Sequence, residues 1–198
     1  MEGNTKGFTL VELLAAIIIF GVISIYAIPH IVGLLDDSRK KMYVSDAQRM
    51  ITQVEYKMKA SNSIIEKPDD NDCVVISLLY LDTSDFDVAP NGGEYLKENS
   101  FVIVKNNNGK LEYAVTLVEK TKKGGYLGID LTSKNSLSIG SAVNHVTGFS
   151  QSELIDVNTG VTKSYINRKI SGYVSGNVVA IYNEQEVVDD SYFDINEW

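Results

Sequence analysis

The chain of 198 residues has a formal net charge of −8, 44% hydrophobic residues and a single cysteine. An acidic chain is a poor nucleic-acid binder, because phosphate contacts require a basic face, and one cysteine excludes an internal disulfide framework. The length suits one compact domain with an appendage.

The appendage is an apolar segment near the N-terminus. Residues 1–7 form a short polar leader, and residues 13–35 carry no formal charge. A helix of about 20 apolar residues is long enough to cross a bilayer, so we expect residues 8–35 to form a transmembrane or filament-core helix. The alternative is a secretory signal peptide cut after Ala27, although the apolar region of that class is shorter, about 7–15 residues.

Glu12 is the residue of this segment that requires an explanation. A carboxylate at the centre of a bilayer is costly, and an ionisable residue in a membrane segment points to a function. At the level of the lipid headgroups the same charge is tolerated, because the dipole at a helix N-terminus favours it. The residue alone leaves both interpretations open.

The sequence GFTLVELL, which begins at Gly7, resembles the processing motif of type IV prepilins and pseudopilins. The resemblance implies that a prepilin peptidase cuts after Gly7 and that Phe8 becomes an N-methylated N-terminus. It also implies that Glu12 pairs with the Phe8 amine of a neighbouring subunit during assembly. Pro29 corresponds to a helix kink in that family, since proline removes one backbone hydrogen bond. The resemblance covers residues 7–35.

The same resemblance implies a single-pass subunit of the cytoplasmic membrane, with its N-terminus inside, that later joins a cell-surface pilus. The implied partners are other pilin subunits, the prepilin peptidase, the pilus assembly platform, the lipid bilayer and host or surface ligands. The basic residues oppose this orientation, because Lys6 alone precedes the span whereas Arg39, Lys40 and Lys41 follow it. We give the motif precedence, because the peptidase acts at the cytoplasmic face.

Helical spacing of apolar residues continues beyond residue 36. One stripe is formed by Val44, Ala47, Ile51, Val54 and Met58. Neither Pro nor Gly interrupts residues 34–61. We therefore expect one helix from Thr9 to about Ser61, amphipathic over residues 36–61, with its stripe packed against a sheet.

Residues 62–198 are expected to form the globular head of an α+β, pilin-like fold in which the long N-terminal helix packs on an antiparallel sheet. Residues 62–94 indicate a connection between helix and sheet, because turn-forming clusters recur there. The apolar run 74–81 within this connection fits either a strand or a two-turn helix. Residues 76–95 resemble the loop between helix and sheet in pilins and pseudopilins.

Residues 95–131 predict a three-stranded antiparallel meander. Its first hairpin turns at Asn106–Gly109, where Asn and Gly tolerate positive φ. Residues 132–198 predict additional, weaker strands and an acidic tail, and the strands are expected near residues 162–166, 170–174 and 178–182.

The acidic loop 69–87 is the one constellation that suggests a metal. Its candidate ligands are Asp70, Asp72, Asp85 and Asp87, and calcium prefers such oxygen donors. Their spacing does not match an EF-hand loop, so a solvated acidic loop without metal is the preferred interpretation.

The remaining reactive side chains indicate no enzyme and no cofactor. The sequence contains no metalloprotease, nucleophile-elbow, phosphate-loop or Cys-x-x-Cys motif. Cys73 is expected to be a free thiol. His30 is expected to pack within the apolar helix or to lie at the level of the headgroups, and His145 has no Cys or acidic residue nearby in the sequence.

The sequence therefore predicts a major or minor structural subunit of a type IV pilus, used for adhesion, twitching motility or DNA uptake. The nearest alternative is a pseudopilin of a type II secretion or competence machine. An alternative from another class is a secreted or membrane-tethered binding protein or enzyme.

Overall fold

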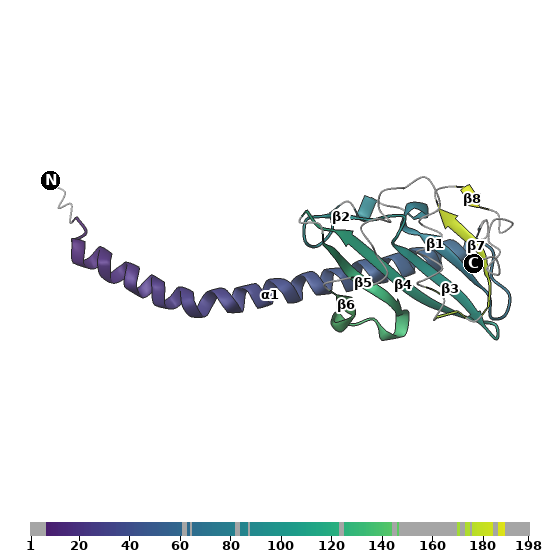
Figure 1. The fold of residues 1–198 in the computed structure, drawn as a ribbon, viewed down its shortest axis with the longest axis horizontal. Coiled ribbons are helices and arrows are strands. Elements are labelled where there is room, and N and C mark those ends of the chain that lie inside the picture. The colour runs from purple at the N-terminus through teal and green to yellow at the C-terminus, as the bar shows by residue number, and fades with distance from the viewer. Residues whose placement is uncertain are drawn as a thin grey trace. The chain divides into compact units, whose positions relative to one another are not determined.

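The computed structural model describes residues 7–60, 63, 65–81, 84–86, 88–122, 125–143, 146, 170, 173–174, 176–183 and 186–188. The chain divides into two compact units, Met1–Ser38 and Arg39–Trp198. Helix α1 (Leu10–Lys59) contributes to both units, and the strands belong to the second (Figure 1).

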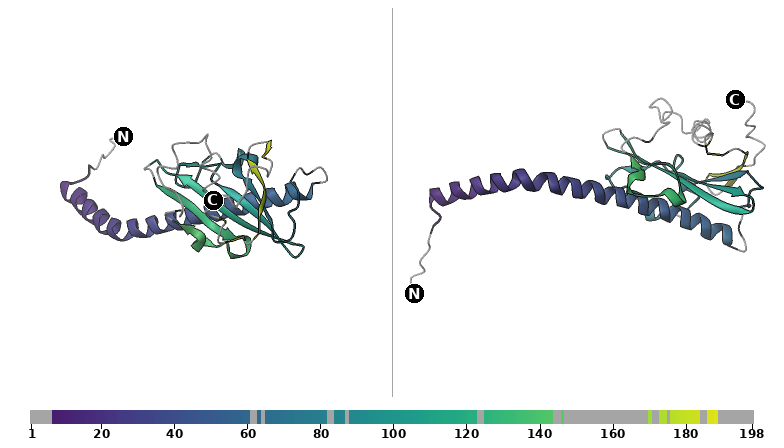
Figure 2. Two further views of the ribbon diagram at one scale, coloured as in Figure 1. Left: turned by 45° about the vertical axis from the view of Figure 1, so that its right-hand side comes forward. Right: turned by 90° about the horizontal axis from the view of Figure 1, so that it is seen from below.

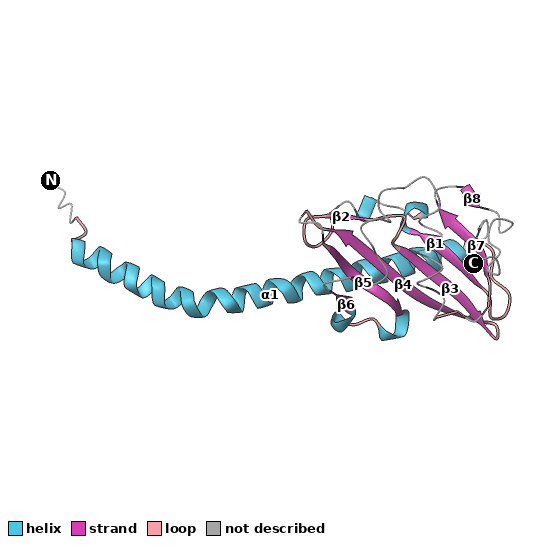
Figure 3. Ribbon diagram, in the orientation of Figure 1, coloured by secondary structure: helices cyan, strands magenta, loops and turns pink. Residues whose placement is uncertain are grey.

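Helix α1 confirms the single long helix expected from the sequence. It has 50 residues, includes Pro29 and is drawn as one unbroken helix in Figure 3. Its most apolar 18-residue window has a mean hydropathy of 2.5, and none of that window is buried. By length and composition, α1 is therefore able to cross a membrane.

In the second unit, one side of α1 is buried. Its buried residues are Tyr43, Ala47, Met50, Ile51 and Val54, and Val44 and Met58 are partly buried beside them. The expected stripe is thus confirmed. It is wider than predicted, because Tyr43 and Met50 lie next to it at spacings of three and four residues.

Within the described residues, the second unit holds one eight-stranded sheet. The strands are β1 (Cys73–Ser77), β2 (Glu94–Tyr95), β3 (Phe101–Asn107), β4 (Lys110–Lys120), β5 (Tyr126–Ser133), β6 (Ala142–Val143), β7 (Val178–Asn183) and β8 (Glu186–Val188). Their order across the sheet is β6-β5-β4-β3-β1-β7-β8, and β2 pairs with β4. The α+β layout is confirmed. The sheet is mixed and not wholly antiparallel as expected, because β1 and β7 are parallel.

The predicted meander is present as β3, β4 and β5. The β3–β4 hairpin turns at Asn108 and Gly109, whose φ angles are 51° and 85°. Positive φ at both central positions matches the twist of the paired strands, and Asn and Gly adopt it with little strain. The Gly109 N–H donates to Asn106 Oδ1 at 2.8 Å and to Asp70 Oδ1 at 3.1 Å.

One face of the sheet packs against the second part of α1, as the right-hand view of Figure 2 shows. Alternate strand residues point to this face, among them Val74 of β1, Val102 of β3 and Val115 of β4. Together with the helix stripe they form the main core. Burial of this apolar surface, at about 25 cal/mol per Å², is the principal force that holds helix and sheet together.

The other face of the sheet is also covered. The second core cluster consists of Cys73, Val75, Phe101, Ile103, Ile170, Val178 and Ile181. Strand β1 is buried on both faces, which explains why its sequence is a continuous apolar run instead of an alternating one.

Strand β1 decides the alternative left open for the apolar run 74–81. Residues 73–77 form a strand, and Leu78–Tyr80 continue as a short 3-10 helix, η1. The segment predicted as a connection therefore contains a central strand, because β3 and β7 pair with it on its two sides.

The strand predictions beyond residue 132 have different outcomes. The strand near residues 178–182 is confirmed as β7. The prediction of a strand near 170–174 is wrong for the residues described there. The N–H groups of Tyr173 and Val174 both donate to the Ile170 carbonyl oxygen, at 2.7 and 3.0 Å, and so form a helical turn. The strand near 162–166 lies outside the described residues, as does the acidic tail apart from β8.

Candidate functional site

The predicted cleavage junction lies before the helix. Gly7, Phe8 and Thr9 are exposed and have no regular secondary structure, and α1 begins at Leu10. Among the described residues, none lies within 4 Å of a Cβ atom added to Gly7. The described part of the chain therefore makes no steric demand for glycine at this position.

Thr9 and Glu12 form a capping box at the start of α1. The Thr9 N–H and hydroxyl both donate to Glu12 Oε2 at 2.9 Å, and the Glu12 N–H donates to Thr9 Oγ1 at 3.3 Å. These bonds satisfy donors that the first turn of a helix leaves open. Sequence reasoning missed this pair, although Thr-x-x-Glu before an apolar run is the signature of a capping box.

Glu12 is followed by a long exposed apolar surface. Phe8 is 87% exposed, and large apolar side chains remain more than half exposed along α1 as far as Leu35. No formal charge occurs between Glu12 and Asp36. Because a single chain leaves this surface uncovered, lipid or other chains have to cover it.

Residues 3–28 match the family model of the prokaryotic N-terminal methylation motif. The chain carries the type IV prepilin signature. This signature contains the Gly7–Phe8 junction and the Thr9–Glu12 capping box. No curated protein and no solved structure matches the chain.

The prepilin signature implies processing by prepilin peptidase and assembly with other pilins. Together with the exposed apolar part of α1, it fits anchoring in a membrane before assembly. Pro29 lies just beyond the matched residues and inside α1, and the kink expected there stays a prediction.

The acidic loop shows no cluster of metal-binding side chains among the residues that the structure describes. Two of its aspartates have structural roles, because Asp70 Oδ1 accepts from the Gly109 N–H and Asp72 Oδ1 accepts from the Asn177 N–H at 2.9 Å. These bonds connect the loop to the β3–β4 turn and to the start of β7. The side chains of Asp85 and Asp87 lie outside the described part of the chain.

Cys73 is a free cysteine, as predicted, and it is buried in β1. Burial raises the pKa of its thiol to about 12, and the neighbouring Asp72 acts in the same direction. The thiol is therefore protonated at neutral pH, and a protonated thiol is a weak nucleophile. His30 is exposed on α1, and His145 lies outside the described residues.

Sequence reasoning also missed a fully buried carboxylate in the second unit, that of Glu119 on β4. It accepts hydrogen bonds from the Tyr43 hydroxyl, from the Asn91 N–H at 3.2 Å and from the Gly93 N–H at 2.9 Å. A Cβ on Gly93 would lie 2.3 Å from the Lys120 carbonyl oxygen and 2.7 Å from Glu119 Oε1, so only glycine allows this close approach to the backbone of β4. Glu119 thereby connects α1, β4 and the loop before β2.

Two tyrosines that contact acids on this side of the sheet predict an alkaline instability. Burial raises the pKa of Tyr43 and of Tyr95, and hydrogen bonds to Glu119 and Asp46, respectively, raise it further. Both folded values lie above the unfolded value of about 10. The stability that these groups contribute is fully present below that pH and is lost as the pH rises above it.

We therefore expect the free energy of unfolding to decrease from about pH 10 upward, and Tyr95→Phe to make that decrease shallower. Chemical unfolding followed by circular dichroism at a series of alkaline pH values measures the slope. Tyr56→Phe, at an exposed position of α1, is the matched control. An equal slope in Tyr95→Phe and in the unmodified protein would contradict the assignment.

Proposed function

We propose that the chain is a structural subunit, major or minor, of a type IV pilus, and that it does no catalytic work. The observation that carries this proposal is the exposed apolar surface of α1, which begins directly after the prepilin junction and is interrupted by one acid, Glu12. A surface of this kind packs stably only in lipid or against other such helices. The absence of catalytic motifs from the sequence supports a structural role.

In this proposal the subunit waits in the cytoplasmic membrane with its N-terminus inside. Cleavage after Gly7 creates a charged amine at Phe8, which is then methylated. In the filament, Glu12 of one subunit pairs with the Phe8 amine of its neighbour, because a carboxylate and an ammonium removed from water are tolerated only together. The resulting filament serves adhesion, motility or DNA uptake.

Intact-mass and N-terminal peptide analysis of the protein from its native cells tests the processing step. We expect a chain that begins at Phe8 and carries one additional methyl group. A mature chain that begins at residue 1 or at Ile28 would overturn the proposal, because the first shows no cleavage and the second shows a signal peptide.

Gly7→Val is expected to abolish this cleavage. Since none of the described residues lies within 4 Å of a Cβ at Gly7, we expect the substitution to leave folding unchanged and to act on binding to the peptidase. The N-terminal peptide should then retain residues 1–7 in nearly all molecules. Gly3→Val, at the other glycine of the leader, is the control and should be cut normally. Correct trimming of Gly7→Val would refute the site.

The second candidate is a pseudopilin, because pseudopilins share the processing motif. The 3-10 helices η1 (Leu78–Tyr80) and η2 (Ser84–Phe86), followed by β2, fit the helix–sheet loop of both groups. Immunoelectron microscopy of filaments sheared from native cells separates the two. Long surface filaments that contain this chain support the pilus, and their absence together with a defect in secretion or DNA uptake supports the pseudopilin.

A further inference from the structure

A pocket of about 350 Å³ opens at one end of the sheet in the second unit. It is lined by Glu55 of α1, by the first residues of β4, by the end of β5 with the 3-10 helix η3 (Lys134–Ser136), and by Tyr173. At about 30 Å³ for each water molecule, its volume equals roughly a dozen waters, which is room for one or two sugar rings.

The pocket exists because β5 is shorter than β4. Among the described residues, pairing between these strands stops at Ala114 and Ser133, where the chain turns into η3. Residues 110–113 of β4 pair with β3 on one side, and the side that β5 would occupy faces the pocket. Backbone groups of β4 therefore contribute to its wall.

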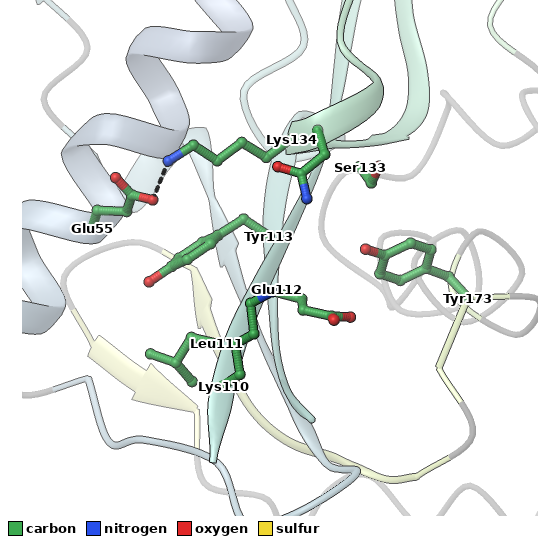
Figure 4. A pocket seen from close by; sticks show the side chains of 9 residues that line it. Glu55, Lys110, Leu111, Glu112, Tyr113, Ser133, Lys134 and Tyr173 are labelled. Carbon is green, nitrogen blue, oxygen red and sulfur yellow. Dashed lines mark hydrogen bonds and ion pairs between the residues drawn. The ribbon is translucent and has the colours of Figure 1, made fainter. Parts of the chain in front are cut away.

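Two tyrosine rings flank the pocket, and a carboxylate lies between them. Figure 4 shows Tyr113 and Tyr173 on opposite sides of β4, with the Glu112 carboxylate extending toward Tyr173. Burial first, and then the nearby acids Glu55 and Glu112, raise the pKa of Tyr113 and Tyr173, respectively. Both hydroxyls therefore stay protonated at neutral pH, so each is able to donate and to accept a hydrogen bond.

The charges of the pocket cancel. Its lining contains two lysines and two glutamates, and one of each is joined in the ion pair between Lys134 and Glu55. Ser133 and Asn135 add an uncharged hydroxyl and an amide. A lining without net charge, rich in groups that both donate and accept, suits an uncharged polyhydroxyl ligand better than an ion.

An extended peptide fits this site less well. An added strand would follow the side of β4 that β5 leaves open, but the chain at Ser133–Asn135 closes one end of the pocket. Only four residues of β4 are open to such a strand, a length of about 13 Å. Aromatic faces bordered by polar groups instead match a sugar ring, which has an apolar C–H face and a rim of hydroxyls.

We propose that this pocket binds an uncharged sugar ring of a glycan, with the C–H face of the ring on Tyr173 and its hydroxyls hydrogen-bonded to Glu112, Ser133 and Asn135. Binding requires neither cleavage at Gly7 nor a filament, so this inference and the pilus assignment fail or succeed independently.

Saturation-transfer difference NMR on the full chain tests the proposal, in a zwitterionic detergent that contains no sugar. The probes are the methyl glycosides of glucose, galactose and N-acetylglucosamine, with methyl glucuronide as the acidic comparator. We expect at least one neutral glycoside to bind with a Kd of about 1 mM. Saturation should be strongest on its C–H protons.

Tyr173→Ser is expected to weaken this binding at least tenfold. Tyr56→Ser is the matched control, because it makes the same change on an exposed part of α1 outside the pocket. Glu112→Ala, at a partly exposed position, is a second pocket variant, and its result does not depend on whether Tyr173→Ser folds. We expect its affinity for the glycoside to fall at least fivefold. Three outcomes overturn the proposal. They are no binding of any neutral glycoside, binding by both pocket variants as tight as by the unmodified protein, or tighter binding of the glucuronide than of the neutral glycosides.

Discussion

Glu119→Ala is expected to lower the free energy of unfolding of the second unit by about 3–5 kcal/mol, because it leaves buried partners without their acceptor. The partners are the Tyr43 hydroxyl and the N–H groups of Asn91 and Gly93. For a unit of this size, 1 kcal/mol corresponds to about 2–4 °C in Tm, so the expected decrease is about 10 °C. Thermal unfolding of the full chain in detergent, followed by near-UV circular dichroism of the tyrosines, measures it.

Two variants make this result specific to the buried carboxylate. Glu119→Gln keeps the side-chain volume and one acceptor oxygen. It should therefore lower the free energy of unfolding by about half as much as Glu119→Ala does. Glu112→Ala removes a partly exposed carboxylate from the same strand, and its effect should stay below about 1 kcal/mol. Equal melting temperatures for Glu119→Ala and Glu112→Ala would show that the three hydrogen bonds contribute nothing to stability.

Glu12→Ala is expected to leave cleavage intact and to reduce incorporation into filaments by roughly tenfold or more. The reason is that the Phe8 amine of the neighbouring subunit would be buried without a counter-charge. Processing is read from the N-terminal peptide mass, and incorporation from the amount of the chain in sheared filaments. This prediction rests on the proposed pilus function.

The capping box requires a control, because Glu12→Ala also removes the acceptor for the Thr9 N–H and hydroxyl. Glu12→Gln retains a capping acceptor but no charge, so it should fail to assemble as Glu12→Ala does. Thr9→Val removes the side-chain cap but keeps the charge, and it should assemble. Normal incorporation of Glu12→Gln would mean that Glu12 acts by capping the helix and not by pairing with an amine.

Several features were predictable because their signals are local. The Gly7–Phe8 junction, Glu12 and the uncharged run that follows are contiguous in the sequence, and the apolar stripe of the second part of α1 repeats every three or four residues. The β3–β4 hairpin was predictable for the same reason, since Asn108 and Gly109 adopt the positive φ angles that such a turn requires.

Other features depend on residues that are distant in the sequence. Strand β1 was not recognised as central, because a strand buried on both faces loses the alternation that identifies a strand. Its parallel partner β7 begins about a hundred residues later, a separation at which sequence patterns carry no pairing information. The segment near residues 170–174 was misassigned because a short apolar run fits a strand as well as a helical turn.

The sequence by itself determined the type of the molecule: a prepilin signature, an apolar helix that follows one acid, and a helix stripe that requires a sheet. Only the tertiary structure decided where Glu119 lies, what Asp70 and Asp72 bind, and that Tyr113 and Tyr173 line one pocket. The physical reason is the range of the interactions. A processing motif and a helix depend on neighbouring residues, whereas the bond between Tyr43 and Glu119 joins residues 76 positions apart and exists only after the sheet has formed on the helix.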